Sequence, residues 1–172
     1  MSLRYPVNEK DHCMGNPNAP IQLLEYGDYQ CPYCGQAYPI VKQLQQHFGN
    51  DIYFIFRNFP LANIHPHAKL AAIASEAAAR QNKYWEMHDS LFENQKRLNL
   101  TSIIGYAEEL QLDLFKFRVD VTNPTLEEHV ESDFYGGMRS GVSQTPTFFI
   151  NGEKYTGSWE QDPFIQHLQT LM

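Results

Sequence analysis

Two cysteines three positions apart are the residues with the clearest potential for chemistry. They lie in Cys31-Pro32-Tyr33-Cys34, and the only other cysteine among the 172 residues is Cys13. Three cysteines are too few to form a structural disulfide framework in a chain of this length. The same close spacing occurs in redox-active dithiols and in metal-binding pairs. The pair therefore indicates chemistry rather than cross-linking.

Redox chemistry fits the rest of the sequence better than metal binding does. A zinc site normally needs four ligands, which usually come from a second pair of Cys or His residues. Outside the pair the chain offers Cys13 and seven histidines, with no recognisable ligand spacing. We therefore expect a redox pair with no metal and no cofactor. A metal-binding CxxC module remains an alternative.

The segments around the pair predict a strand, a helix and a second strand. The apolar run Ile21 to Tyr26 suits a buried strand that ends just before the cysteines. After Cys34, apolar residues recur every three or four positions as far as Phe48, and Gly49-Asn50 then ends this amphipathic helix. The run from Ile52 to Phe56 is again typical of a strand. The first third of the chain is therefore predicted to be βαβ.

The middle of the chain is predicted to be helical, and its end returns to strands. Between about Asn63 and Ser140 the helical patterns carry Thr101 and Asp113 as capping candidates and Pro124 at a first helical position. A hairpin then follows, from strand 147–150 through Asn151-Gly152 to strand 153–156, with a last helix at 163–171. The order βαβ…ββα predicts an α/β fold with one central sheet and an inserted helical subdomain.

The position of Cys31 predicts a reactive thiolate. Cys31 follows a strand and precedes a helix, and Pro32 suits the first helical turn because its missing N–H costs nothing there. The free N–H groups and the positive end of the helix dipole favour a thiolate, and they lower the pKa of such cysteines from about 8.5 to roughly 3.5–7.5. Cys34 lies one turn further into the helix, where it would be less accessible. We expect Cys31 to be the nucleophile and Cys34 the resolving thiol.

Two motifs together resemble a known family. The segment from Glu25 to Cys34 (EYGDYQCPYC) and the segment from Gly141 to Gly152 (GVSQTPTFFING) are similar to the DsbA-like branch of the thioredoxin superfamily. The resemblance implies a single domain over residues 1–172, with a thioredoxin fold at about 15–61 and 141–172 and a helical insertion at about 62–140. It also implies a cis peptide bond between Thr145 and Pro146 that faces the cysteines.

The resemblance assigns further roles around the cysteines. Thr145 and Pro146 would hold an extended substrate segment by backbone pairing, and Pro32 and Tyr33 would contact substrate. Glu25 would be a buried acid whose pKa is raised, so that it could carry protons for Cys34. The cysteine motif of DsbA itself is similar to Cys-Pro-His-Cys, whereas this chain has Tyr33 in place of the histidine. The loss of that positive charge predicts a milder oxidant.

The expected function is thiol–disulfide exchange with protein or peptide thiols and disulfides, with glutathione or a redox-recycling protein as candidate partners. A redox-sensing or partner-binding module without turnover is the leading alternative, and a glutathione-using enzyme is another. Cys13 is expected to be a passive thiol. His65 and His67 are expected to serve local packing and capping.

Charge and hydropathy exclude other classes. The net charge of −7 and pI of about 5.4 argue against nucleic acid, and no run of about 18 apolar residues suggests a membrane span. The opening MSLRYPVNEK lacks the apolar region of a signal peptide, so the sequence as written is predicted to be cytoplasmic. Removal of a leader would instead make it periplasmic or exported.

Overall fold

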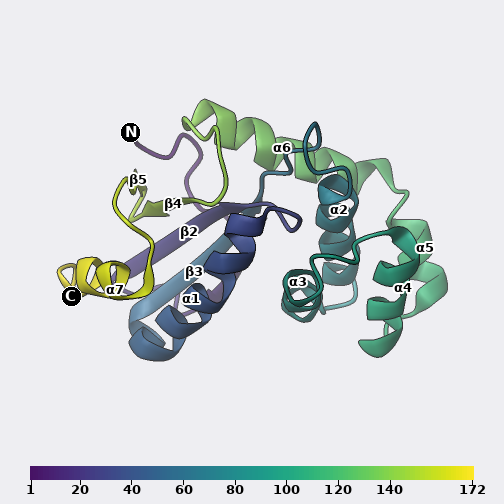
Figure 1. Cartoon of the computed structure of the whole chain (residues 1–172), viewed down its shortest axis with the longest axis horizontal. Coiled ribbons are helices and arrows are strands. Elements are labelled where there is room, and N and C mark those ends of the chain that lie inside the picture. Colours follow the sequence, from purple (N-terminus) through teal and green to yellow (C-terminus); the bar gives the residue numbers. More distant parts are fainter.

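A computed structural model describes all 172 residues as a five-stranded sheet with helices on both faces and a group of helices beside it (Figure 1). The strands are β1 His12–Gly15, β2 Ile21–Gly27, β3 Ile52–Asn58, β4 Thr147–Ile150 and β5 Glu153–Lys154. The helices are α1 Pro32–Phe48, α2 Ala68–Ala79, α3 Tyr84–Glu93, α4 Leu100–Glu109, α5 Leu114–Asp120, α6 Pro124–Arg139 and α7 Gln161–Gln169, with a short 3₁₀ helix η1 at Gly49–Asp51.

The sheet has the strand order β1-β3-β2-β4-β5. Strands β2 and β3 are parallel and connected through α1, whereas β4 is antiparallel to β2 and β5 is antiparallel to β4. This is the predicted order βαβ…ββα, and the α/β thioredoxin fold with inserted helices is confirmed. The parallel pair brings the end of β2, where the cysteines follow, to the same edge of the sheet as the end of β3.

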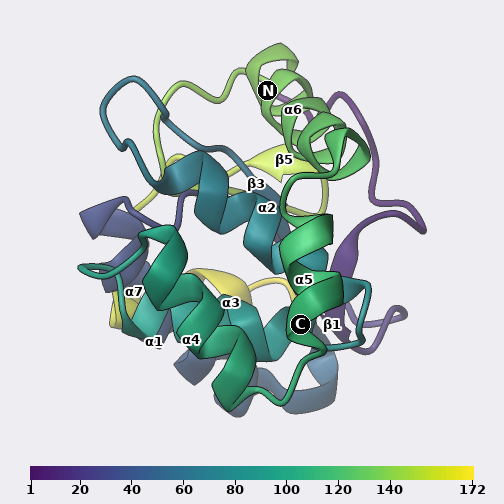
Figure 2. The ribbon, with the colours of Figure 1, turned by 90° about the vertical axis from the view of Figure 1, so that its right-hand side faces the viewer.

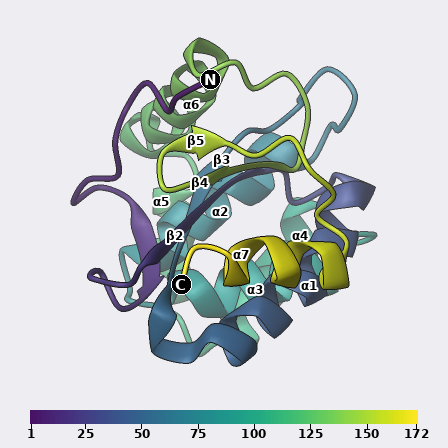
Figure 3. The same ribbon diagram turned by 90° about the vertical axis from the view of Figure 1, so that its left-hand side faces the viewer.

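The core has one layer on each side of the sheet. Helices α1 and α7 cover one face and α6 crosses the other (Figure 3). Alternation along the strands sends neighbouring side chains to opposite faces. Leu23 and Phe54 therefore pack with the cysteines and α1, whereas Leu24 and Ile55 pack in the smaller cluster on the α6 side.

Helices α2 to α6 lie between β3 and β4 in the chain, and α2 to α5 pack beside the sheet (Figure 2). Helix α2 is buried on most sides, and its alanines, including Ala71, Ala74 and Ala77, are completely buried. Such small side chains allow neighbouring helices to approach closely. The division of the chain at about 62 and 140 remains a prediction.

Several local predictions need correction. Strand β1 was not predicted, because HCMG is short and has no alternating pattern, and it places Cys13 inside the sheet rather than before it. Thr101 does not cap α4. Asn99 does, because its side chain accepts a hydrogen bond from the N–H of Ser102 at 2.9 Å.

Other boundaries follow the sequence more closely. Asp113 caps α5 and Pro124 opens α6, as predicted. Strand β5 is shorter than expected and ends at Lys154, while α7 begins at Gln161 and ends at Gln169, two residues earlier at each end than predicted. The hairpin turn at Asn151-Gly152 has positive φ at both residues (49° and 84°), which matches the twist of the flanking strands.

The N-terminal segment forms one edge of the sheet and pairs with the strand at the other. Its β1 pairs with β3 at one edge. At the other edge the N–H of Leu3 donates to Gly152 O (2.7 Å), and the N–H of Lys154 donates to Met1 O (2.9 Å). Strand β5 is therefore paired on its outer side along part of its length, whereas β1 forms the opposite edge. None of the helices combines the length and apolar character needed to cross a membrane.

Candidate active site

The cysteine pair lies at the beginning of α1, directly after the loop that follows β2. Cys31 is the residue before the first helical turn and has an extended backbone (φ −68°, ψ 123°), and Pro32 occupies the first turn as predicted. Cys34 is completely buried and Cys31 has 3% of its surface exposed. The N–H of Asp28 points to Cys34 Sγ at 3.5 Å. A reactant can therefore reach Cys31 more readily than Cys34.

The two sulfur atoms have opposite pKa shifts. The pKa of Cys31 is lowered to about 5, mainly by a hydrogen bond from the Cys34 thiol, against the effect of burial. Thr145 and the backbone N–H groups of Cys34 and Tyr33 lower it further. Burial raises the pKa of Cys34 well above its ordinary value. The predicted thiolate at Cys31 is thus supported, but its strongest partner is the neighbouring thiol and not the helix N-terminus.

The loop before β4 faces the cysteines. The Thr145–Pro146 peptide bond is cis, as the resemblance implied. In its protonated form Cys31 Sγ donates to the backbone carbonyl of Thr145 at 3.5 Å. The backbone N–H of Thr145 has no hydrogen-bond acceptor within the protein. An extended segment laid beside Thr145 would therefore find an unused donor.

Glu25 lies beneath the cysteines in the middle of β2, where it is paired with Phe56 and Phe148. Its residue surface is only 3% exposed, and Oε1 has no hydrogen-bond partner. Burial, with a smaller contribution from the charge of Cys31, raises the pKa of Glu25 to about 8. A cavity of about 10 Å³ adjoins the carboxyl and is also lined by Lys42. A space of that size holds about one water molecule.

Asp28 holds the loop that carries the pair, and the sequence analysis did not identify it. Its side chain is buried, and Oδ1 accepts hydrogen bonds from the N–H groups of Gln30 (2.7 Å) and Cys31 (3.1 Å). Its Oδ2 lies 2.8 Å from Nδ1 of His65 and accepts from the N–H of Leu61 at 2.8 Å. Asp28 therefore joins the cysteine loop to the segment between β3 and α2.

Gln95, which follows α3, holds the same loop from the other side and was also missed. Its Nε2 donates to the carbonyls of Tyr29 (2.9 Å) and Cys31 (2.9 Å). A Cβ at position 35 would overlap with Gln95 Oε1, so Gly35 is needed for this close approach. An Asp three residues before a CxxC was a signal that could have been found, whereas nothing in the sequence near Gln95 points to this contact.

Of the other residues that the sequence analysis named, some lie beside the cysteine pair and others lie away from it. The Tyr33 side chain, 61% exposed, lies in solvent beside the pair, and Pro32 is exposed too. His65 reaches the site through Asp28, while His67 contributes a backbone N–H to Gln30 Oε1 (2.7 Å). Cys13 packs on the opposite face of the sheet from Cys31 and Cys34.

Comparison with known proteins agrees with this geometry. Residues 7–169 match the family described as Thioredoxin. The chain belongs to the thioredoxin family. A thioredoxin-like oxidoreductase from Silicibacter pomeroyi DSS-3 is similar in structure, with a TM-score of 0.83, 25% identity and coverage of 95% of this chain and 92% of that one.

Two further structures share the fold. BdbD from Bacillus subtilis in its oxidised form has a TM-score of 0.83 and 23% identity, and covers 94% of this chain and 92% of its own. The structure of α-DsbA1 from Wolbachia pipientis has a TM-score of 0.85 and 22% identity, with coverage of 98% of this chain and 94% of that one. The predicted DsbA-like resemblance is thereby confirmed at the level of the fold.

The curated relatives are much longer proteins. The Na(+)/H(+) antiporter NhaA 1 of Salinispora arenicola is 44% identical over 160 residues, which are 92% of this chain and 24% of that protein. The antiporter NhaA of Herminiimonas arsenicoxydans is 41% identical over 161 residues, which are 93% of this chain and 25% of that protein. This thioredoxin-family chain therefore spans about a quarter of the relatives that it matches.

Proposed function

We propose that this protein is a thiol–disulfide oxidoreductase that exchanges disulfides with protein or peptide substrates through Cys31 and Cys34. The observation that carries the proposal is the opposite shift of the two pKa values within one turn of α1, where Cys31 has a pKa of about 5 and Cys34 one well above normal. A nucleophile that is ionised at neutral pH stands beside a thiol that keeps its proton until it is needed.

In the reductive direction the Cys31 thiolate attacks one sulfur of a substrate disulfide. A mixed disulfide forms, and the other substrate sulfur leaves as a thiolate that takes a proton from water. Cys34 then gives up its proton and attacks Cys31 Sγ, which releases the second substrate sulfur and leaves the Cys31–Cys34 disulfide. In the oxidative direction the same steps run in reverse, and substrate thiols are oxidised as the pair is reduced.

Glu25 is the proposed proton carrier for Cys34. With a pKa of about 8, its carboxyl exchanges protons near neutral pH. The charge of the Cys31 thiolate contributes to that raised value. When Cys31 enters a mixed disulfide the charge disappears, so Glu25 ionises more readily at the step that needs a base for Cys34. The adjoining cavity gives room for a water molecule that would pass the proton on.

Substrates are proposed to bind as an added strand beside Thr145, with Pro146, Pro32 and Tyr33 at the reacting sulfurs. The unused N–H of Thr145 supports this arrangement. A groove of about 410 Å³ between the segment that starts at Pro60 and helix α6, lined by Leu61, Val130 and Phe134, would add apolar contacts. Backbone pairing and apolar contacts both predict broad selectivity.

The direction is proposed to be oxidative. At pH 7 a Cys31 pKa near 5 instead of 9 stabilises the reduced form by about 2.7 kcal/mol, which corresponds to about 60 mV. We expect a reduction potential of about −120 to −180 mV, which would suit an oxidising compartment outside the cytosol. A value of about −230 to −270 mV would instead indicate a cytosolic reductant. Equilibration with glutathione buffers and thiol alkylation measures it.

The test of activity is the reduction of insulin by dithiothreitol under multiple turnover. We expect turnover in the unaltered protein, only the uncatalysed rate in Cys31→Ser, and an unchanged rate in the control Cys13→Ser. A redox sensor would give no turnover in any of them. Retention of glutathione-dependent activity by Cys34→Ser would favour a glutathione-using enzyme.

The antiporter relatives favour a second candidate, in which the same exchange acts on a membrane transporter. The variant Cys34→Ser would hold its substrate as a mixed disulfide with Cys31. Recovery of a cation transporter from the membrane fraction, absent with Cys31→Ser, would support this role. Recovery of unrelated cysteine-containing proteins alone would favour a general oxidoreductase.

A further inference from the structure

A group of histidines and carboxylates lies away from the cysteines, and we call it the histidine–carboxylate cluster. It consists of His12 from β1, Glu76 from α2, and His129 and Asp133 from α6. One ligand atom from each of His12, Glu76 and His129 lies within 4.8 Å of the other two. His12 Nε2 is 2.8 Å from Glu76 Oε2, and His129 Nε2 is 3.5 Å from Glu76 Oε1 and 3.8 Å from Asp133 Oδ2.

The two carboxylates of the cluster are largely buried, and no lysine or arginine forms an ion pair with either of them. The side chains of Glu76 and Asp133 are only 6% and 14% exposed. Asn58 Nδ2 donates to both of them, at 3.1 Å in each case. The nearby Arg57 is already held by Asp11, through Nε at 2.7 Å and a terminal nitrogen at 2.8 Å. Two neutral imidazoles and two carboxylates would be balanced by one dication.

The ligand side chains are held in place before any ion binds. The ring of His12 stacks on Tyr84, with 3.6 Å between the ring centroids and 12° between the planes. Asn58 fixes the two carboxylates, and His129 and Asp133 lie one turn apart on α6. Such preorganisation is what a metal site requires of the groups around it.

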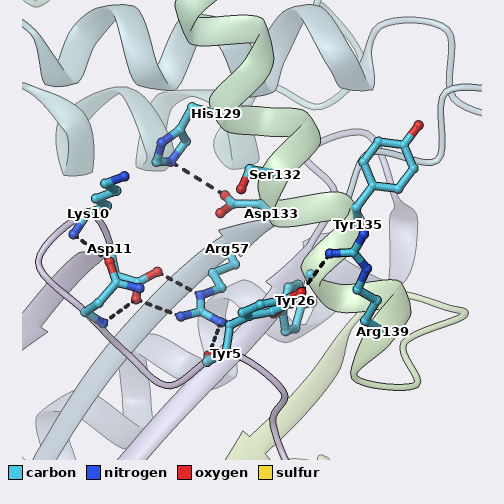
Figure 4. Close-up of a pocket in the computed structure, with 12 residues that line it drawn as sticks. Tyr5, Lys10, Asp11, Tyr26, Arg57, His129, Ser132, Asp133, Tyr135 and Arg139 are labelled. Carbon is cyan, nitrogen blue, oxygen red and sulfur yellow. Dashed lines mark hydrogen bonds and ion pairs between the residues drawn. The ribbon is translucent and has the colours of Figure 1, made fainter.

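Solvent reaches the cluster through a cavity of about 570 Å³. His129 and Asp133 line its wall, together with Lys10 and Arg57, and Figure 4 shows these side chains around the opening. The cavity lies on the α6 side of the sheet, and neither Cys31 nor Cys34 lines it. An ion could therefore enter without passing the cysteine site.

We propose that His12, Glu76 and His129 bind Zn²⁺, with the carboxylate of Asp133 beside His129 as a further negative charge. Two imidazoles suit zinc, whereas calcium and magnesium prefer sites made of oxygen ligands alone. Tetrahedral zinc with bonds of about 2.0–2.1 Å places its ligand atoms about 3.3–3.4 Å apart. The separations of 2.8 and 3.5 Å between the Glu76 carboxylate and the two histidines lie on either side of that spacing.

The three ligands come from three different elements of the fold, so the role proposed for the ion is structural. The ion would tie the edge strand β1 to α2 and α6, and thus join the sheet to the helices beside it. The proposal does not depend on the redox activity of the cysteines. The cluster escaped the sequence analysis because its histidines and carboxylates come from three distant segments.

The test titrates ZnCl₂ into the protein in a calorimeter. The protein carries Cys13→Ser and the Cys31–Cys34 disulfide, because free thiolates would bind zinc themselves. We expect one ion per chain, and affinity at least about 10-fold weaker in His129→Ala and in Glu76→Gln. Unfolding should move up by about 5–10 °C at a 100-fold excess of free zinc over the dissociation constant. His47→Ala, at an exposed histidine near the end of α1, should bind like the parent.

Two results would overturn the proposal. One is the absence of saturable zinc binding, which would leave the cluster as a network of hydrogen bonds. The other is binding that survives both cluster substitutions or that His47→Ala weakens equally. If Glu76→Gln fails to fold, His129→Ala decides, because that side chain is 28% exposed and its removal is tolerated more easily. Equal binding of Ca²⁺ would also contradict the choice of ligand.

Discussion

The cysteine site and the histidine–carboxylate cluster are assembled differently from the same chain. Cys31 and Cys34 lie within one turn of α1, so the geometry of the reactive sulfurs is fixed by a local element. The cluster brings together three elements, in which His12 lies 64 residues before Glu76 and Glu76 lies 53 residues before His129. The spacing of the two sulfurs should persist if the helices beside the sheet shift. The histidine–carboxylate cluster, in contrast, requires those helices to be docked on the sheet. The two reactive sulfurs are thus positioned by one helix, whereas the cluster depends on contacts between three separate elements.

The largest expected effect is on the free energy of unfolding, which the buried carboxyl of Glu25 at the cysteine site lowers. The raised pKa of Glu25, about 8 against 4.5, means that the folded protein keeps a proton that the unfolded chain releases. Stability therefore falls as the pH rises from about 4.5 to about 8. Glu25→Gln removes this penalty, so the reduced variant should be more stable than the parent by roughly 2–5 kcal/mol at pH 8 and similar to it at pH 4.

Urea unfolding at both pH values measures this difference. Glu109→Gln, at an exposed position of α4, is the matched control and should leave the pH dependence unchanged. If Glu25→Gln kept the same slope of stability with pH as the parent, the buried carboxyl would not be the source of the penalty. The contrast between a destabilising cysteine site and a stabilising cluster would then be lost.

The next effect tests how local the thiolate is. The Cys34 thiol is the main cause of the low pKa of Cys31, so Cys34→Ala should raise that pKa from about 5 by about 1 to 2. Cys34→Ser keeps a donor and should raise it less. The rate of alkylation of Cys31 by iodoacetamide as a function of pH reports the value. Identical profiles in the two variants and the parent would assign the thiolate to the helix N-terminus instead.

The smallest effect separates positioning from stability. Gln95→Ala removes two hydrogen bonds to the backbone of the cysteine loop and should cost about 1–2 kcal/mol of stability. Gln81→Ala is a matched control, because Gln81 makes two backbone hydrogen bonds to Asp113, between the helices. Both should unfold at lower urea, but only Gln95→Ala should also lower insulin turnover. Equal turnover in the two variants would limit Gln95 to a structural role.

The sequence predicted those features that depend on neighbours in the chain. Strand β2, helix α1 and the hairpin at Asn151-Gly152 have periodicity or turn residues that specify them within a few positions. The proposed thiolate at Cys31 likewise follows from its position before a helix. Glu25 and the cis bond before Pro146 needed the family resemblance, since neither a buried acid nor a cis bond follows from local pattern alone.

The features that the sequence did not predict depend on distant partners. Gln95 reaches the Cys31 carbonyl across 64 positions, and no pattern near it distinguishes it from a surface glutamine. Strand β1 has four residues and is specified by its pairing with β3 rather than by its own alternation. The cluster combines both difficulties, because β1 supplies His12 and its partners belong to helices that are unremarkable in sequence.

The pairing of Met1 and Leu3 with the turn and strand at Gly152 and Lys154 has a consequence for folding during synthesis. Residues Met1 and Leu3 are synthesised before their partners, which are made about 150 positions later. Until then residues 1 to 3 have no strand to join, and this edge of the growing sheet is open to other chains. Residues 1 to 3 should therefore be among the last to dock, and a nascent chain stalled before β5 should be prone to aggregation.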